Sequence, residues 1–131
     1  ICTKELVTTK GIRSLSPKSG GYTPMYVGRQ ENRDQAYHQG TAWPWLMGFY
    51  LEAYLRVYKM SGVNYIERRL IGFEEELYYH CVGTIPELFD GNPPFHGRGA
   101  ISFAMNVSGI LRAIRLIEKQ RAAEEAAEAA E

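Results

Sequence analysis

Two carboxylates, Glu87 and Asp90, are the groups in this chain that are best suited to acid–base chemistry. They lie within the stretch 82–100, and their closest apolar neighbours are Ile85, Leu88 and Phe89. A carboxylate among apolar side chains can have its pKa moved into the range that proton transfer requires. The sequence leaves a second reading open, in which Glu87 caps or pairs with a neighbouring structural element.

The stretch 82–100 is predicted to be a long loop between two helices. Gly91, Pro93 and Pro94 interrupt any regular element there, and helix-like sequence lies on either side. Long loops held between stable helices often carry binding and catalytic groups. The loop is therefore the first place to look for a site.

Other reactive residue types give weaker signals. His80 and His96 are read as a helix-end residue and a loop residue, and no His or Cys pair has the spacing of a metal site. The segment 97–99, Gly-Arg-Gly, is too short to indicate phosphate binding. Cys2 and Cys81 are too few for a disulfide framework, so we expect free thiols in a reducing compartment. We predict no metal and no cofactor.

Composition narrows the class of protein. A chain of 131 residues is large enough for one domain with a sizeable core, and 45% hydrophobic with 23% charged residues is typical of a globular protein. The 15 basic and 15 acidic residues balance, which argues against nucleic acid as a partner. No apolar run approaches the roughly 20 residues of a membrane span, so no membrane partner is expected.

The first strong helix is predicted over residues 42–60. Thr41 is a suitable N-cap, Pro44 is tolerated in the first turn, and Ser61–Gly62 is expected to end the helix. Its residues are apolar on nearly all sides, which is typical of a helix buried between other helices.

Two further helices and a tail follow. Asn64 and Glu67 have the spacing of a capping box, so we predict an amphipathic outer helix from Asn64 to about Cys81. A third, apolar helix is predicted over 101–119. The segment 121–131 has high helix propensity but little to bury, and we expect a solvated helical or frayed tail.

The segment before residue 42 is less regular. Residues 1–9 are read as a helix stub that ends at Lys10–Gly11, residues 11–17 as a short extended piece, and 18–30 as a packed loop. The predicted fold class is mainly α, with three to four helices joined by long functional loops.

Three motifs in the correct order resemble one protein family. They are Gly-Ile-Arg-Ser-Leu-Ser-Pro at 11–17, Arg-Asp-Gln-Ala-Tyr-His-Gln-Gly-Thr-Ala-Trp-Pro-Trp-Leu at 33–46, and Gly-Thr-Ile-Pro-Glu-Leu-Phe-Asp-Gly-Asn-Pro-Pro at 83–94. The chain resembles the C-terminal, amylo-α-1,6-glucosidase part of glycogen debranching enzymes over about residues 10–117. The resemblance implies the C-terminal portion of an (α/α)6 barrel related to glucoamylases, with residues 1–120 in the glucosidase domain and 121–131 as a tail.

The resemblance also implies an activity and a role for Glu87. Position for position, Glu87 matches the general base of an inverting glycosidase that removes α-1,6-linked glucose from glycogen branch stubs. The general acid belongs to an earlier part of the family barrel, outside this chain, and Asp90 is read as a turn residue.

A set of substrate-binding residues follows from the same resemblance. Two of its members would stack on sugar rings and four would bind sugar hydroxyls: Trp43 and Trp45, then Arg33, Asp34, His38 and Gln39. For each tryptophan, core packing is the alternative.

One departure from the family pattern keeps other functions open. The family usually has Gln-Ala-Trp-Ser at the start of the last inner helix, whereas this chain has Phe-Ala-Met-Asn at 103–106. A non-catalytic carbohydrate binder is therefore the alternative, and a helical scaffold is a third reading. The partners expected are a branched α-glucan and the rest of the barrel in a parent chain. We expect the isolated chain to self-associate without activity, and a cytoplasmic location.

Overall fold

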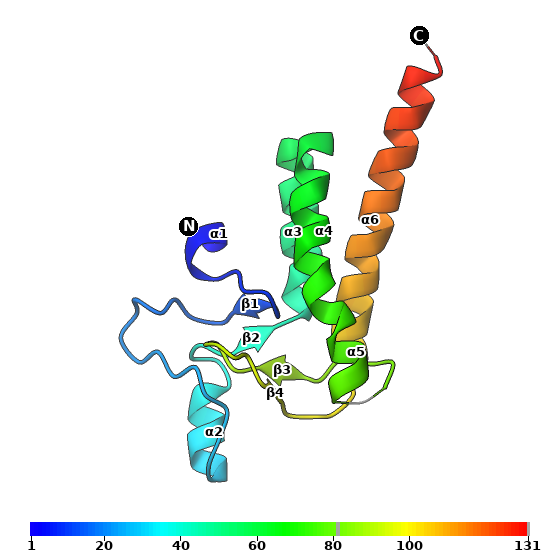
Figure 1. Cartoon of the computed structure of the whole chain (residues 1–131). Coiled ribbons are helices and arrows are strands. Elements are labelled where there is room, and N and C mark those ends of the chain that lie inside the picture. Colours follow the sequence, from blue (N-terminus) through cyan, green and yellow to red (C-terminus); the bar gives the residue numbers. More distant parts are fainter. Residues whose placement is uncertain (81, 131) are drawn as a thin grey trace.

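Three long helices lie side by side above a small sheet in the computed structural model, which describes residues 1–80 and 82–130 (Figure 1). The long helices are α3 (Trp45–Tyr58), α4 (Met60–Glu74) and α6 (Ala104–Glu128). Three short helices complete the set: α1 (Cys2–Glu5), α2 (Gln30–Ala36) and α5 (Glu76–Tyr79). The mainly α prediction is confirmed, while membership of a barrel stays a prediction.

The sheet consists of four two-residue antiparallel strands that lie in chain order. They are β1 (Ile12–Arg13), β2 (Ala42–Trp43), β3 (Leu88–Phe89) and β4 (Gly97–Arg98). Only β1 falls within a predicted extended segment. The pairings Ile12↔Trp43, Ala42↔Phe89 and Leu88↔Arg98 bring the loop 82–100 against the segment before α3.

The predicted start of the first long helix is wrong by three residues. Ala42 and Trp43 belong to β2, so α3 begins at Trp45 with Pro44 as its N-cap. Thr41 does not cap the helix; its Oγ1 donates to the Tyr37 carbonyl at 2.8 Å. Ala42 and Trp43 are extended because they pair with β1, so the helix cannot begin at the residue after Thr41.

The predicted break between the first two long helices is also misplaced. The chain turns at Lys59, whose φ of 48° is in the left-handed region, and both Ser61 and Gly62 lie inside α4. Asn64 is therefore a helix-interior residue and caps nothing. Gly62 serves packing: a Cβ there would lie 3.2 Å from the Tyr54 ring.

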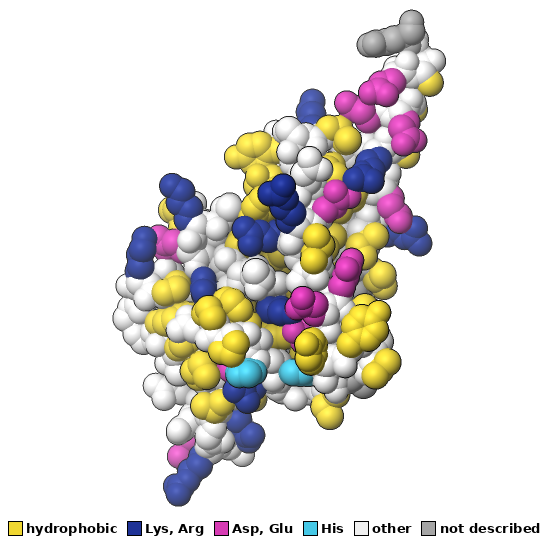
Figure 2. All heavy atoms as spheres, viewed as in Figure 1, with side chains coloured by type: hydrophobic (Ala, Val, Ile, Leu, Met, Phe, Trp, Pro, Cys, Tyr) yellow, Lys and Arg dark blue, Asp and Glu magenta, His cyan; other side chains and the backbone are white. Residues whose placement is uncertain are grey.

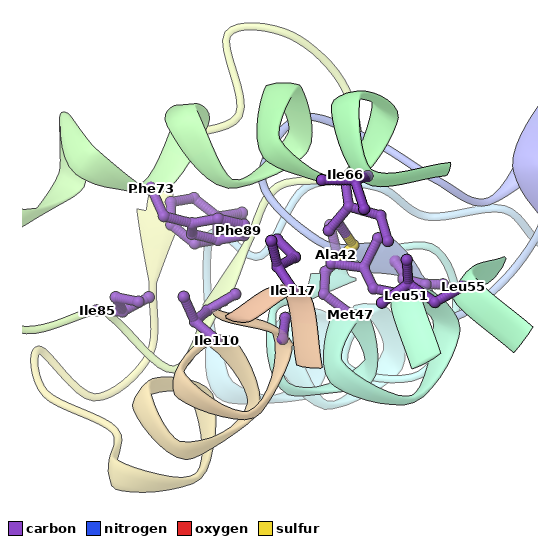
Figure 3. Close-up of a cluster of buried hydrophobic side chains, with 13 residues drawn as sticks. Ala42, Met47, Leu51, Leu55, Ile66, Phe73, Ile85, Phe89, Ile110 and Ile117 are labelled. Carbon is purple, nitrogen blue, oxygen red and sulfur yellow. The ribbon is translucent and has the colours of Figure 1, made fainter. Parts of the chain in front are cut away.

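The core lies between α3, α4, α6 and the sheet (Figure 3). The helices α3 and α6 cross closely because Gly48 and Gly109 face each other; a Cβ on Gly48 would lie 2.7 Å from the Gly109 carbonyl oxygen. The expectation that α3 is buried on nearly all sides is wrong for one face. There Phe49 and Val57 are 58% and 71% exposed.

The N-terminal segment is held by a buried ion pair. The helix α1 ends at Glu5, before the predicted end at Lys10, and Cys2 in it carries a free, half-buried thiol. Lys10 is buried, and its Nζ lies 2.6 Å from Glu76 Oε1 and 2.5 Å from the Gly72 carbonyl oxygen. The segment before β1 is thereby tied to α4 and α5.

The tail continues α6 without a break to Glu128, and its residues are exposed. Acidic side chains gather on this projecting end of the molecule (Figure 2). The predicted helix end at Cys81 lies outside the described residues. Among the helices described, none is both long and apolar enough to cross a membrane.

Candidate active site

The backbone at Glu87 is fixed from two sides. Its N–H donates to the Ala100 carbonyl at 2.9 Å, which closes the loop around β3 and β4. From the first turn of α6, the fully buried Asn106 donates through Nδ2 to the carbonyls of Pro86 (2.5 Å) and Glu87 (2.7 Å). Asn106 Oδ1 accepts the N–H of Trp45 at 3.0 Å. One amide side chain thus joins the start of α3, the start of α6 and the Glu87 loop.

The Glu87 carboxylate is held by one donor on each oxygen. Oε2 accepts the Ala100 N–H at 2.8 Å, and Oε1 accepts the Tyr37 hydroxyl. Burial and the neighbouring Glu87 raise the pKa of Tyr37 to about 12, so Tyr37 stays protonated and donates. A carboxylate has about four lone-pair sites, so each oxygen keeps capacity to accept another proton.

Glycine 99 is required beside this carboxylate. Its φ of 72° is in the left-handed region, and a Cβ there would overlap Glu87 Oε2. Glycine meets both demands because it has no Cβ and visits this region freely. The chain therefore brings the Ala100 N–H close to Glu87 by way of a residue with no side chain.

Glu87 forms part of the wall of an open, mainly polar hollow of about 730 Å³, called here the Glu87 hollow. Its lining comes from three segments of the chain: Tyr26, Val27 and Gly28; Arg33; and Glu87, Arg98, Gly99 and Ala100. A water molecule in such a hollow can reach the carboxylate. A positioned carboxylate next to water is the arrangement that general-base catalysis needs.

Arg98 is positioned by Asp90. Asp90 is fully buried, and its Oδ2 accepts from Arg98 Nε (3.0 Å) and Nη2 (2.9 Å), while its Oδ1 accepts the Tyr26 N–H at 2.9 Å. A buried carboxylate needs such partners, because an unpaired buried charge is costly. Asp90 follows β3 directly, at the predicted turn. Its carboxylate also binds two residues that line the hollow, Arg98 and Tyr26.

Two of the predicted substrate-binding residues come from α2. Arg33 lines the Glu87 hollow, and its guanidinium lies 6.0 Å from the centre of the Tyr26 ring. Asp34 is exposed on the same helix and is not part of the described lining. Of this pair, only Arg33 is brought to the hollow that contains Glu87.

Three more predicted substrate-binding residues lie near Tyr37 in the chain or in space: His38, Gln39 and Trp43. The ring of His38 lies 4.8 Å from that of Tyr37 and stacks at 6.2 Å on Trp43. Trp43 is only 7% exposed, packs edge-on against Tyr37 at 4.8 Å, and donates its indole N–H to Thr41 Oγ1. The side chain of Gln39 is exposed, while its carbonyl accepts the Thr23 N–H. His38 and Trp43 thus pack against the ring of Tyr37, whose hydroxyl donates to Glu87.

Trp45 lies elsewhere. It is half-buried at the start of α3 and lines a separate, mainly apolar hollow with Phe49, Met105 and Arg112. Met105 stands where the family pattern has tryptophan. The departure therefore falls in the Trp45 hollow, and Asn106 beside it makes the contacts to the Glu87 loop described above.

The sequence reading missed three site residues: Tyr37, Arg98 and Asn106. Tyr37 lies inside the motif at 33–46 but carried no predicted role. The signal that the sequence offered was its position directly before His38 and Gln39, which were predicted to bind sugar. The other roles needed the distances across the fold. Among the described residues, no group of three or more His, Cys, Asp or Glu side chains could hold a metal ion.

Comparison with known proteins places these residues in one family. A family model for amylo-alpha-1,6-glucosidase matches residues 1–112. Over 50 residues the chain is 38% identical to a glycogen debranching enzyme of Saccharomyces cerevisiae; the match covers 34% of this chain and 3% of that enzyme. No solved structure matches. Since the family model spans most of the chain and includes Glu87 with its partners, the chain belongs to the amylo-α-1,6-glucosidase family.

Proposed function

We propose that this chain supplies the general base of an inverting glycosidase that releases α-1,6-linked glucose from glycogen branch stubs. The observation that carries the proposal is the Glu87 carboxylate, held by Tyr37 and Ala100 and open to the Glu87 hollow, in a chain of this family. A protein that only binds the glucan has no need of a general base.

In the proposed reaction, Glu87 takes a proton from a water molecule whose oxygen attacks the anomeric carbon of the terminal glucose. The bond from that carbon to the branch oxygen breaks, and the oxygen takes a proton from a carboxylic acid on another part of the full-length protein. Attack and departure on opposite faces invert the configuration. The two carboxyl groups then stand roughly 6.5–9.5 Å apart, which leaves room for the water.

The hydrogen bonds to Glu87 suit this role. Each carboxylate oxygen accepts one hydrogen bond, from the Tyr37 hydroxyl or the Ala100 N–H, so the carboxylate is already oriented before the water arrives. The two hydrogen bonds also restrain both oxygens, each of which keeps a free accepting site for a water molecule in the hollow. Positioning of this kind contributes to the rate because the reacting groups need no further ordering.

The proposed sugar contacts differ in how well their positions support them. Arg33 lines the Glu87 hollow and is the best placed of these residues to donate a hydrogen bond to a sugar hydroxyl. The side chains of Asp34, His38 and Gln39 are exposed on the same and the following segment. Trp45 lines an open hollow and can stack on a sugar, whereas Trp43 is already packed on both sides. These roles remain proposals for the intact enzyme.

The test is glucose release from a branched limit dextrin by the full-length enzyme, with Glu87→Gln compared with wild type. Loss of a general base is expected to reduce kcat by about 10²- to 10⁴-fold while dextrin binding is kept. Glu31→Gln is the matched control, because Glu31 is an exposed carboxylate at the start of α2.

Other outcomes point to the alternatives. A wild-type enzyme that binds the dextrin but releases no glucose is a carbohydrate-binding relative, as the Met105 position allows. If the wild type neither binds nor cleaves the dextrin, membership of the family reflects common ancestry and not present function. Equal activity of Glu87→Gln and wild type would remove Glu87 from the mechanism.

The exposed apolar faces support a parent chain as partner. Phe49 on α3, Ile71 on α4 and Leu111 on α6 are 58%, 55% and 55% exposed, more than a lone domain usually leaves open. We propose that the rest of the barrel covers them, and that the isolated chain self-associates and lacks activity. A monodisperse monomer in light scattering would contradict this. A cytoplasmic location, where glycogen would be met, stays a prediction.

A further inference from the structure

A second hollow adjoins strand β4. It has a volume of about 320 Å³ and is called here the Tyr79 hollow; it is lined by Tyr79, His80, Pro86, Gly97, Arg98, Gly99 and Ile101. Arg98 and Gly99 line both hollows. Residues of a single strand and its end therefore separate the two spaces.

The wall of the Tyr79 hollow is built into the fold. The His80 imidazole, at the end of α5, packs directly on Gly97, and a Cβ on that glycine would overlap the ring. Gly97 is itself paired with Phe89 in the sheet, so the imidazole rests on a fixed backbone. Arg98 is fixed by the buried Asp90. Arg98 is thus held in place before any ligand binds, and the exposed His80 lies against the backbone of Gly97.

The apolar part of the Tyr79 hollow is exposed. Tyr79 is 77% and Ile101 is 65% exposed, and histidine and apolar side chains lie together at the α5 and sheet end of the molecule (Figure 2). An exposed tyrosine presents a flat apolar face together with a hydroxyl group, which suits ligands that are apolar on one face and polar at the edges. The arrangement of one aromatic wall and a few polar groups is typical of small-ligand sites.

The charge of the Tyr79 hollow favours a neutral ligand. Its cation, Arg98, already makes an ion pair with Asp90, and no second Lys or Arg belongs to the described lining. An anion such as a phosphate would be attracted only weakly, because the charge of Arg98 is already balanced by Asp90. A sugar ring, which is neutral, carries hydroxyls at its edges and has an apolar face, fits the lining better.

We propose that the Tyr79 hollow binds a further glucosyl unit of the same branched α-glucan whose terminal unit occupies the Glu87 hollow. Tyr79 stacks on the ring of this unit, and His80 and Arg98 bind its hydroxyls. The inference rests on the proposed function, because the glucan must first enter the Glu87 hollow. It assigns recognition of the polymer to residues that take no part in bond cleavage.

The test compares Tyr79→Ala with Tyr78→Ala in the full-length enzyme. Tyr78 is the matched control, since it is 80% exposed, precedes Tyr79 in α5 and is not in the described lining. Two substrates are used: a branched limit dextrin, which fills both hollows, and α-glucosyl fluoride, which carries a single glucosyl unit. Tyr79→Ala is expected to raise KM for the dextrin about three- to tenfold, the size of one aromatic contact, and to leave kinetics on the fluoride unchanged.

Each outcome decides the inference separately from the proposed function. Equal dextrin KM for the two variants overturns it, and so does an equal loss on both substrates, which would place Tyr79 at the Glu87 hollow. If the wild type cleaves neither substrate, the proposed function fails. The Kd for dextrin then decides alone: weaker binding by Tyr79→Ala than by Tyr78→Ala upholds a glucan site in the Tyr79 hollow, and equal binding removes it.

Discussion

The substitution Asn106→Ala is expected to loosen the Glu87 loop without touching the carboxylate. It removes the amide that donates to the Pro86 and Glu87 carbonyls and accepts the Trp45 N–H. Each buried polar group left without a partner costs about 1–3 kcal/mol. Because the Glu87 carbonyl is only partly buried, we expect a total near 2–5 kcal/mol, a large part of the 5–15 kcal/mol that stabilises a typical domain.

Hydrogen exchange of the full-length enzyme measures this effect where it occurs. The amides of Glu87 and Phe103 are the probes, since they donate to the carbonyls of Ala100 and Ile85 across the loop. A free energy of opening lowered by 2–5 kcal/mol speeds their exchange by about 30-fold to several thousand-fold. We expect kcat to fall with it, because Glu87 is then held for less of the time.

Two further variants of α6 sharpen the comparison. Asn106→Asp keeps an acceptor for the Trp45 N–H but turns a carboxylate toward two carbonyl oxygens, so it should loosen the loop at least as much as Asn106→Ala. Ser108→Ala is the control, because the Ser108 hydroxyl is exposed and donates only to the Met105 carbonyl within α6. Exchange at Glu87 in Asn106→Ala within about threefold of the Ser108→Ala rate would refute the reasoning.

Two more predictions concern the carboxylate. Tyr37→Phe removes a hydrogen bond to the carboxylate, worth about 1.5–3 kcal/mol, and should lower kcat by about ten- to a hundredfold. The raised pKa of Tyr37, about 12, keeps its hydroxyl protonated up to pH 9, so the ratio of kcat to that of the wild type should not change between pH 7 and 9 in a pH–rate profile. Tyr58→Phe is its control, because Tyr58 is 51% exposed and lies at the end of α3, away from the Glu87 hollow. A ratio that varies between pH 7 and 9 would contradict the assignment. Gly99→Ala should lower kcat far more than Gly83→Ala, since both glycines have positive φ but only the first has Glu87 against its Cβ position; equal losses would show that backbone strain alone matters.

The sequence predicted the helices of this fold better than their ends. Periodic apolar residues indicated three long helices, and three were found. Their boundaries depend on contacts that the local sequence does not contain. Thr41 has the chemistry of a cap, but the sheet takes the two residues that follow it. Lys59 turns the chain although lysine rarely adopts a positive φ.

The residues that the family resemblance pointed to could be named from the sequence. Glu87 and Arg33 were both named in advance, and both line the Glu87 hollow. Tyr37 and Asn106 reach Glu87 from distant points in the chain, and no local pattern marks them as its partners. The two-residue strands that bring these segments together are too short to show the alternation by which strands are recognised.

The pairing of β2 with β3 has a consequence for how this protein folds. The strands are neighbours in the sheet, yet α3, α4 and α5 all lie between them in the chain. Closing so long a loop costs conformational entropy that two-residue strands cannot offset, so we expect the helices to pack first. Tyr37 and Glu87 therefore meet only when the rest of the chain has folded. The carboxylate site forms late, and a partly folded chain can have its full helix content without any activity.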